Sequence, residues 1–143
     1  MSPTNRRTVP VALGRRVRQR ARHRCGYCLC SETLLGMPME FDHLIPQAAG
    51  GTTRAENLWL ACRRCNRWKG SDLSAIDSAT GAITPLFNPR AHMWQEHFAL
   101  EGAQIVGLTS VGRATVALLQ FNEPRRVIQR RVLIDVGRYP PHA

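Results

Sequence analysis

Hydrophobic positions recur at helix or strand spacing along the first half of the chain, and they predict four elements. Residues 11–24 carry their apolar side chains on one stripe, with arginines on the other faces, which predicts a helix. Residues 38–45, "PMEFDHLI", alternate apolar and polar positions and predict a strand. Residues 57–61, "NLWLA", predict a second strand, and "CNRWKGSDL" predicts a short helix that ends near Gly70.

The second half of the chain has a different pattern, which predicts loops followed by a hairpin and two helices. The segment "SATGAITPLFNPRAHMW" is rich in loop-forming residues. A hairpin is predicted at about 97–108, with its turn at Glu101 and Gly102. Helices are predicted at about 110–121 and 124–136, the second opening with a proline.

The charge of the chain adds a functional prediction to this small domain, namely that it binds nucleic acid. The formal net charge of the 143-residue chain is +10, and arginine carries nearly all of it, because Lys69 is the single lysine. The first acidic residue is Glu32, and eight arginines precede it. Guanidinium groups make forked contacts with phosphate that an ammonium cannot make. A basic arm on a basic domain predicts a nucleic-acid partner, with solubility alone as the alternative role of the arginines.

The compartment follows from what the sequence lacks. No segment approaches the ~20 apolar residues of a membrane helix, so no membrane partner is expected. The N-terminus has no apolar stretch of a secretory signal. It is arginine-rich like a transit peptide, but it leads directly into the first cysteine pair. The sequence therefore predicts a cytoplasmic protein of bacterial type, whose thiols stay reduced.

Five cysteines supply the clearest chemical signal. Cys25 with Cys28, and Cys62 with Cys65, form two C-x-x-C pairs, and Cys30 is left over. Two residues between cysteines let both thiolates point at one ion, and two such pairs complete a closed tetrahedral site. We therefore expect a structural zinc ion at the four paired cysteines, with disulfides or plain buried thiols as the alternative. Cys30 is expected to be a small buried residue, because its spacing fits neither pair; a competing zinc ligand is the alternative.

The residues between and around the cysteine pairs carry a family resemblance. The pairs bracket residues 29–61, a longer insertion than the ~15–20 residues of a compact zinc ribbon. The chain reads C-x2-C, DH, N, then C-x2-C-N-x2-K-G, and this pattern resembles the HNH endonucleases, whose catalytic unit is the ββα-metal fold. The resemblance spans about residues 15–72. It rests on Cys25, Cys28, Asp42, His43, Asn57, Cys62, Cys65, Asn66, Lys69 and Gly70.

The resemblance implies an α+β fold, with a small ββα-metal core stapled by the four-cysteine zinc site. The core is expected at residues 25–72, preceded by a basic N-terminal arm and helix at residues 1–24. Residues 73–143 would form a C-terminal extension of a hairpin and helices. This extension looks like a tail that accompanies some bacterial HNH proteins.

The resemblance also implies a role for each polar residue of the motif. His43 would be the general base that takes a proton from the attacking water. Asp42 would bind a catalytic divalent cation, Mg²⁺ or Mn²⁺. Asn66 would complete this metal site, in the position where the family name expects a histidine; its amide oxygen suits hard ions. Asn57 would hold the loop and orient His43.

Each of these residues also has a structural interpretation. His43 would instead be a packing residue or a further zinc ligand. Asn57 and Asn66 would cap turns or the helix. Glu40 lies two positions before Asp42 and would be either a further metal or network partner or a solvated strand carboxylate.

Four basic side chains crowd the second cysteine pair and the short helix. They follow or flank the expected catalytic metal ligands, so they would contact the phosphate backbone there, with a solvated basic face as the alternative. These residues are Arg63, Arg64, Arg67 and Lys69.

The sequence therefore favours a bacterial or phage HNH endonuclease that hydrolyses phosphodiester bonds in DNA. Double-stranded DNA is the expected partner, Zn²⁺ the structural ion and Mg²⁺ or Mn²⁺ the catalytic ion. A non-catalytic zinc module that binds nucleic acid would need the cysteines and arginines, but not Asp42, His43 and Asn57 together. A nuclease directed at RNA is the third hypothesis, because charge alone does not separate the two nucleic acids.

Overall fold

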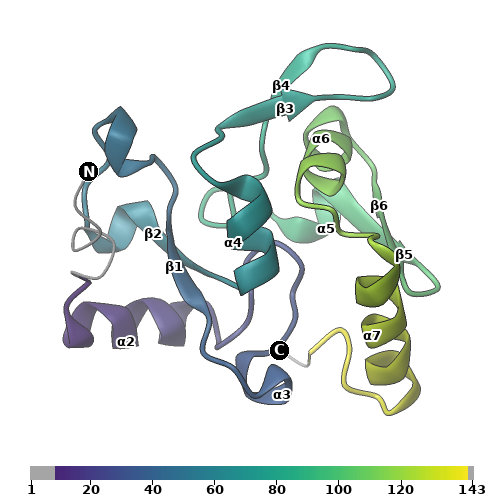
Figure 1. Ribbon diagram of the computed structural model, residues 1–143, viewed down its shortest axis with the longest axis horizontal. Coiled ribbons are helices and arrows are strands. Elements are labelled where there is room, and N and C mark those ends of the chain that lie inside the picture. The colour runs from purple at the N-terminus through teal and green to yellow at the C-terminus, as the bar shows by residue number, and fades with distance from the viewer. Residues whose placement is uncertain (1–8, 142–143) are drawn as a thin grey trace.

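The structure is a computed structural model that describes residues 9–141, and it has the expected mixed architecture of helices and small antiparallel sheets (Figure 1). A two-stranded sheet of β1 (Glu40–His43) and β2 (Leu58–Ala61) leads into helix α4 (Arg63–Lys69). The order of strand, loop, strand and helix that the sequence predicted between the cysteine pairs is therefore confirmed.

Helix α2 (Val11–Arg20) packs against the sheet and is not a free arm. Val17 is buried, and Gly14 approaches Phe41 so closely that an added Cβ would lie 2.8 Å from the ring. The glycine that weakens the helical pattern therefore serves this close approach. Arg18 also lies over the Phe41 ring, with its Cζ 4.9 Å from the ring centroid, so α2 and β1 are joined by both apolar and cation–π contacts.

The helix is shorter than the sequence predicted. It ends at Arg20, because Arg22 and His23 both adopt a left-handed φ of 56°, which the helix cannot continue through. The rest of the predicted N-terminal arm, residues 1–8 with two of its arginines, lies outside the described residues.

The remaining elements are short, apart from two C-terminal helices. Around the core lie α3 (Glu32–Leu35), η1 (Gln47–Ala49) and η2 (Ala55–Asn57). The extension contains β3 (Ser74–Ile76), β4 (Ile83–Pro85), α5 (Trp94–His97), β5 (Phe98–Glu101), β6 (Gln104–Gly107), α6 (Ser110–Leu118) and α7 (Pro124–Asp135). The β5–β6 hairpin and the two helices lie where the sequence placed a hairpin and two helices.

The β3–β4 hairpin is a correction, because the sequence predicted loop there. Its strands have three residues each, and Ile76 and Ile83 face solvent, so no apolar alternation marks them. The hairpin is held by the buried Asp77, which receives two bonds from the guanidinium of Arg113 in α6 at 2.8 and 3.0 Å. This ion pair lowers the pKa of Asp77 and keeps it charged.

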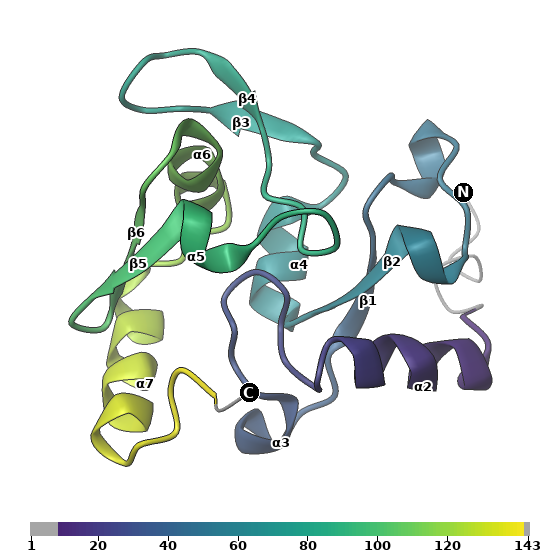
Figure 2. The ribbon, with the colours of Figure 1, turned by 180° about the vertical axis from the view of Figure 1, so that it is seen from behind.

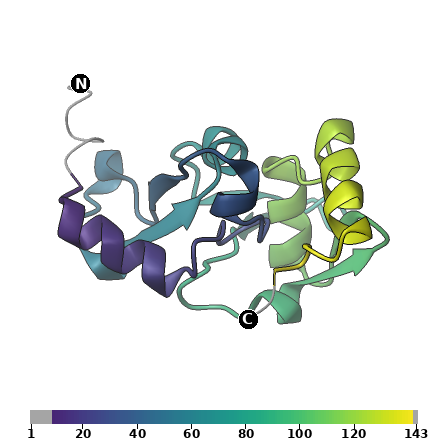
Figure 3. The same cartoon turned by 90° about the horizontal axis from the view of Figure 1, so that it is seen from below.

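One hydrophobic core joins the two halves of the chain. Figures 2 and 3 show α2 and α7 at opposite ends of the molecule, with α4 and the β1–β2 sheet between them. The most deeply buried side chains come from both sides and include Tyr27, Leu60, Phe98, Leu119 and Phe121. Within residues 9–141, no helix has the length and apolar character to cross a membrane.

Candidate active site and metal centre

The four paired cysteines meet in one buried cluster. Their sulfur atoms all lie within 4.8 Å of one another, and Cys28 Sγ is 3.8 Å from Cys62 Sγ. A tetrahedral zinc ion with Zn–S bonds of ~2.3 Å places its sulfurs about 3.8 Å apart, so the cluster fits zinc. Burial raises the pKa of the Cys25 and Cys65 thiols, so a neighbouring cation would be needed to hold them as thiolates.

Local hydrogen bonds and close contacts with β2 shape the two cysteine turns. Cys62 is the N-cap of α4, and its sulfur accepts a bond from the backbone N–H of Cys65 at 3.4 Å. In the first turn Gly26 donates to Leu60 at 2.9 Å, and an added Cβ there would lie 2.2 Å from Trp59. Only glycine allows the first cysteine turn to press this closely against β2.

The other two candidate zinc ligands stay outside the cluster. Among residues 9–141, the group of potential metal ligands contains neither Cys30 nor His43. Cys30 is 5% exposed, as expected for a small buried residue.

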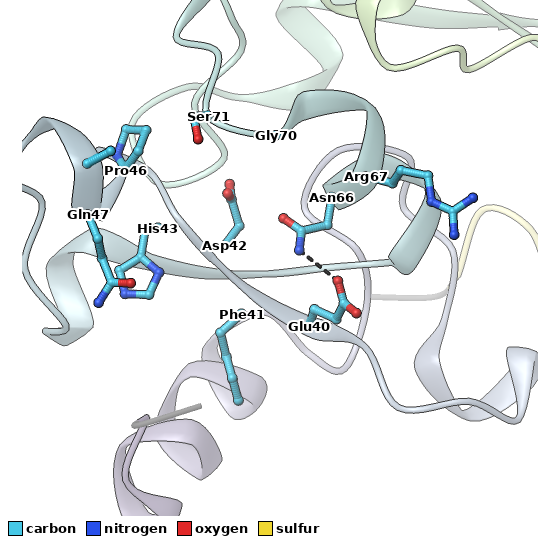
Figure 4. Close-up of a pocket in the computed structure, with 11 residues that line it drawn as sticks. Glu40, Phe41, Asp42, His43, Pro46, Gln47, Asn66, Arg67, Gly70 and Ser71 are labelled. Atoms are coloured by element: carbon cyan, nitrogen blue, oxygen red, sulfur yellow. Dashed lines mark hydrogen bonds between the residues drawn. The ribbon is translucent and has the colours of Figure 1, made fainter. Parts of the chain in front are cut away.

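A separate pocket of about 680 Å³ opens over β1, the following loop and α4. Its lining includes Asp42, His43, Asn66 and Arg67. Figure 4 shows His43 on one side, Asn66 bonded to Glu40 on the other, and Asp42 between them. Three residues singled out for catalysis or metal binding therefore share one cavity, although 23 positions separate the second from the third along the chain.

Asp42 is the buried residue of β1, at 3% exposed. Its Oδ2 accepts a bond from the Tyr27 hydroxyl at 2.5 Å, and its Oδ1 lies 3.2 Å from the ammonium of Lys69. Burial raises the pKa of Asp42, while Lys69 and the Tyr27 hydroxyl act against that rise. Tyr27 belongs to the first cysteine turn, so its side chain joins the cysteine cluster to the pocket.

His43 faces the loop that follows β1. Its Nε2 lies 3.1 Å from Thr53 Oγ1, and Gln47 also reaches that hydroxyl, at 3.5 Å. The imidazole is half-buried, and burial lowers its pKa, with Asp42 opposing the shift. The ring is therefore neutral at pH 7 and held by one nitrogen.

Asn57 closes the loop between the two strands. Its side-chain oxygen accepts from the N–H of Ile45 at 2.8 Å, and its amide donates to the carbonyls of Ile45 and Thr52 at 3.0 and 2.8 Å. Gly51 is required beside this clamp, because an added Cβ would lie 1.7 Å from the Ile45 carbonyl oxygen. The loop that carries Thr53 toward His43 is thus fixed by backbone bonds to one buried amide.

Asn66 is not a helix cap. It is the fourth residue of α4, and its side chain donates to Glu40 Oε1 at 2.7 Å. The pair joins α4 to β1 at the edge of the pocket. Glu40 is exposed, so its carboxylate is more open to solvent than the buried Asp42 carboxylate, which also lines the pocket.

The expected phosphate-contacting residues divide into two groups. Arg63, Arg64 and Arg67 are exposed on α4. Lys69 is a correction: it is 3% exposed, and its ammonium is paired with Asp42 inside the protein. A buried, paired lysine does not suit contact with the outside of a nucleic acid, so only the three arginines remain available for that contact.

The match with known proteins concerns the same segment. Residues 25–72 match the sequence model of the HNH endonuclease family. These residues are an HNH endonuclease domain. The HNH domain contains both cysteine pairs and every residue of the pocket described above.

Two curated relatives resemble parts of the chain. The chain is 27% identical over 114 residues to the Septu protein PtuB of Bacillus thuringiensis, which covers 78% of this chain and 42% of that protein. It is 41% identical over 59 residues to the CRISPR-associated endonuclease Cas9 of Corynebacterium diphtheriae, which covers 41% of this chain and 5% of that protein. The chain therefore spans less than half the length of these relatives. No solved structure matches it at comparable significance.

Three residues of the site were missed from the sequence. The sequence assigned Tyr27 no role beyond separating two cysteines, and it assigned Thr53 only to a polar loop. For Arg126 the sequence indicated only a basic position in a C-terminal helix. In the structure its guanidinium lies against the cysteine cluster. Each acts through a partner that the fold brings in from elsewhere, which no local pattern indicates.

Proposed function

We propose that the chain is a metal-dependent HNH endonuclease that hydrolyses phosphodiester bonds in DNA. The observation that carries the proposal is the single pocket shared by Asp42, His43 and Asn66, with Arg67 in its lining. A module that only binds nucleic acid has no need of this juxtaposition. The family match, and a relative whose name states endonuclease activity, support a nuclease.

His43 is the general base in this proposal. In the tautomer of His43 in which Nε2–H donates to Thr53, Nδ1 keeps its lone pair and takes the proton from the attacking water. The lowered pKa of His43 keeps the ring in this neutral form at pH 7. Asn57 is a positioning residue, because its amide fixes the loop on which Thr53 lies.

The oxygens of the pocket fit a hard divalent ion. Asp42 and Asn66 would hold Mg²⁺ or Mn²⁺, with the Glu40 carboxylate beside Asn66 as a further oxygen donor. A carboxylate has about four lone-pair sites, so Asp42 can serve an ion while Tyr27 and Lys69 remain bound to it. When bound, the ion supplies charge stabilisation at the phosphate and at the departing 3′ oxygen.

The remaining parts of the chain have supporting roles in the proposal. Zn²⁺ at the four cysteines is the structural ion of the core at residues 25–72. The arm and helix at residues 1–24 and the exposed arginines of α4 contact the phosphate backbone of double-stranded DNA. The C-terminal extension expected at residues 73–143 packs on this core over its described part, residues 73–141.

One observation favours the non-catalytic alternative. Both oxygens of Asp42 already have partners within the protein, which is also how a purely structural carboxylate is held. This observation makes cleavage, and not binding, the quantity that must be measured.

A plasmid-conversion assay tests the proposal. Supercoiled DNA is incubated with the purified chain and Mg²⁺, Mn²⁺ or EDTA, beside a labelled RNA. Conversion that needs the divalent ion supports a DNA endonuclease. Tight binding to both nucleic acids with cleavage of neither would establish the binding module, and cleavage of the RNA alone would establish the RNA-directed nuclease.

A further inference from the structure

A buried arginine from the C-terminal extension touches the cysteine cluster. Arg126 lies in α7, is 4% exposed, and points its Nη2 at Cys65 Sγ, 3.1 Å away. The same nitrogen is 4.0 Å from Cys62 Sγ. More than 60 residues of chain separate the arginine from these sulfurs, so the contact exists only in the folded protein.

The guanidinium is held in place from its other side. Its Nη1 donates to the carbonyls of Leu119 and Gln120 at 2.7 and 3.3 Å, at the C-terminal end of α6. Its Cζ lies 5.7 Å from the ring centroid of Phe121. Nη1 therefore caps the C-terminal end of α6, while Nη2 is directed at sulfur. The planar guanidinium makes this possible, because its N–H donors are fixed in different directions.

Charge explains why an arginine belongs there. Four thiolates around one Zn²⁺ carry a net charge of about −2, and here that charge is buried. A buried charge without compensation is costly, and a hydrogen bond from a cation to a thiolate is of the strong, charge-assisted kind. Among residues 9–141, the cationic side chain that hydrogen-bonds to these sulfurs is Arg126.

Two more contacts tie the extension to the same cluster. The hydroxyl of Tyr139 donates to the carbonyl of Cys28 at 2.7 Å. The indole N–H of Trp94 donates to the carbonyl of Tyr27 at 2.8 Å. Both acceptors belong to the first cysteine turn, whereas Arg126 reaches the second, so the extension contacts both ligand pairs.

We propose that Arg126 stabilises the metal site by offsetting negative charge on the metal–thiolate cluster. The affinity of the site for its metal then depends on the folded C-terminal extension, which supplies this arginine. The inference rests on the zinc occupancy proposed above, and it is independent of whether the pocket cleaves DNA. Groups that hydrogen-bond to metal ligands typically contribute 10- to 100-fold to metal affinity.

Arg130 supplies a matched control. It lies about one turn further along α7, is 1% exposed, and donates to the backbone carbonyls of Ala103 and Phe121. No bond from its side chain to a cysteine is present among the described residues. Replacing Arg130 removes a buried guanidinium, its bonds to backbone carbonyls and a through-space attraction to Cys28, but no hydrogen bond to a sulfur.

The test measures zinc release to a chromogenic chelator from the full-length chain. We expect Arg126→Gln to weaken zinc affinity about 10- to 100-fold, and Arg130→Gln to change it less than about threefold even where it lowers stability. With Co²⁺ in place of zinc, Arg126→Gln should shift the sulfur-to-metal charge-transfer band to lower energy, and Arg130→Gln should leave the band unchanged. Loss of a bond to sulfur moves this band, whereas loss of helix packing does not.

Several results would overturn the inference. Equal loss of zinc in both variants would reduce Arg126 to a packing residue, and wild-type release from Arg126→Gln would remove its role. If Arg126→Gln does not fold, Arg126→Met is the substitute, because it keeps an unbranched side chain but removes the charge: release at the wild-type rate with an unshifted cobalt band overturns the proposal, and faster release with a shifted band supports it. A folded wild-type chain that holds no metal would overturn both this inference and the zinc assignment, while leaving the nuclease assay to be decided separately.

Discussion

The bond from Tyr27 to Asp42 links the cysteine turn to the pocket, and Tyr27→Phe tests it. The substitution deletes one hydroxyl from a side chain that is fully buried and leaves the ring in place. Asp42 Oδ2 would lose its partner inside the protein, where no water replaces it, because Asp42 is 3% exposed. Hydrogen bonds to charged groups contribute about 1.5–3 kcal/mol, so the free energy of unfolding should fall by about that amount.

The chain contains a natural comparison in its only other tyrosine. Tyr139 is also buried, but its hydroxyl donates to a neutral carbonyl, that of Cys28. Tyr139→Phe should therefore cost about 0.5–1.5 kcal/mol, roughly half the cost of Tyr27→Phe. Both variants are measured by urea unfolding at pH 7 with zinc held constant, where typical slopes of 1–3 kcal/mol per molar urea turn 2 kcal/mol into a midpoint shift of about 1 M.

Tyr27→Phe should also weaken binding of the catalytic ion, because the Asp42 carboxylate is no longer held on its Oδ2 side. Mn²⁺ binding, followed by the loss of its free electron paramagnetic resonance signal, reports this effect without an activity assay. If Tyr27→Phe costs no more stability than Tyr139→Phe and binds Mn²⁺ as the wild type does, the proposed link between the cysteine turn and the pocket is wrong.

Three further predictions follow from the site. Cys62→Ser should abolish stoichiometric zinc and cooperative folding together, seen by metal analysis and circular dichroism; a folded variant without zinc would contradict the scaffold role. Arg63→Gln with Arg67→Gln should weaken DNA binding at every sequence and reduce the slope of log affinity against log salt by about 1 per lost contact; an unchanged slope would place the DNA elsewhere. Burial lowers the pKa of His43, so cleavage should rise with pH to a plateau whose midpoint lies below the ordinary ~6.5; a midpoint above that value would refute the base assignment.

The sequence predicted the core well because its signals are local. The two C-x-x-C pairs indicate a shared ion by spacing alone, and the structure brings their four sulfurs together. Alternation in residues 38–45 indicates a strand, and β1 occupies its centre. Asp42 and His43 are neighbours at the end of that strand, and both line one pocket.

The parts that were missed depend on contacts distant in sequence. The β3–β4 hairpin has no apolar alternation and is held by Asp77 and Arg113, which are 36 positions apart. Lys69 was expected at the surface because lysines are seldom buried without a partner, and the partner, Asp42, lies 27 positions away. Arg126 meets Cys65 across 61 positions. The residues around each position do not indicate such distant pairs.

The most direct test of the central claim compares the wild type with His43→Ala in single-turnover cleavage of plasmid DNA. His43 is assigned only to proton transfer, so the variant should keep wild-type zinc content, folding and DNA affinity. Cleavage in Mg²⁺ or Mn²⁺ should fall by ~10²–10⁴, the usual contribution of a general base, and EDTA should abolish it in both proteins. Equal cleavage rates for the two proteins in either ion would contradict the account.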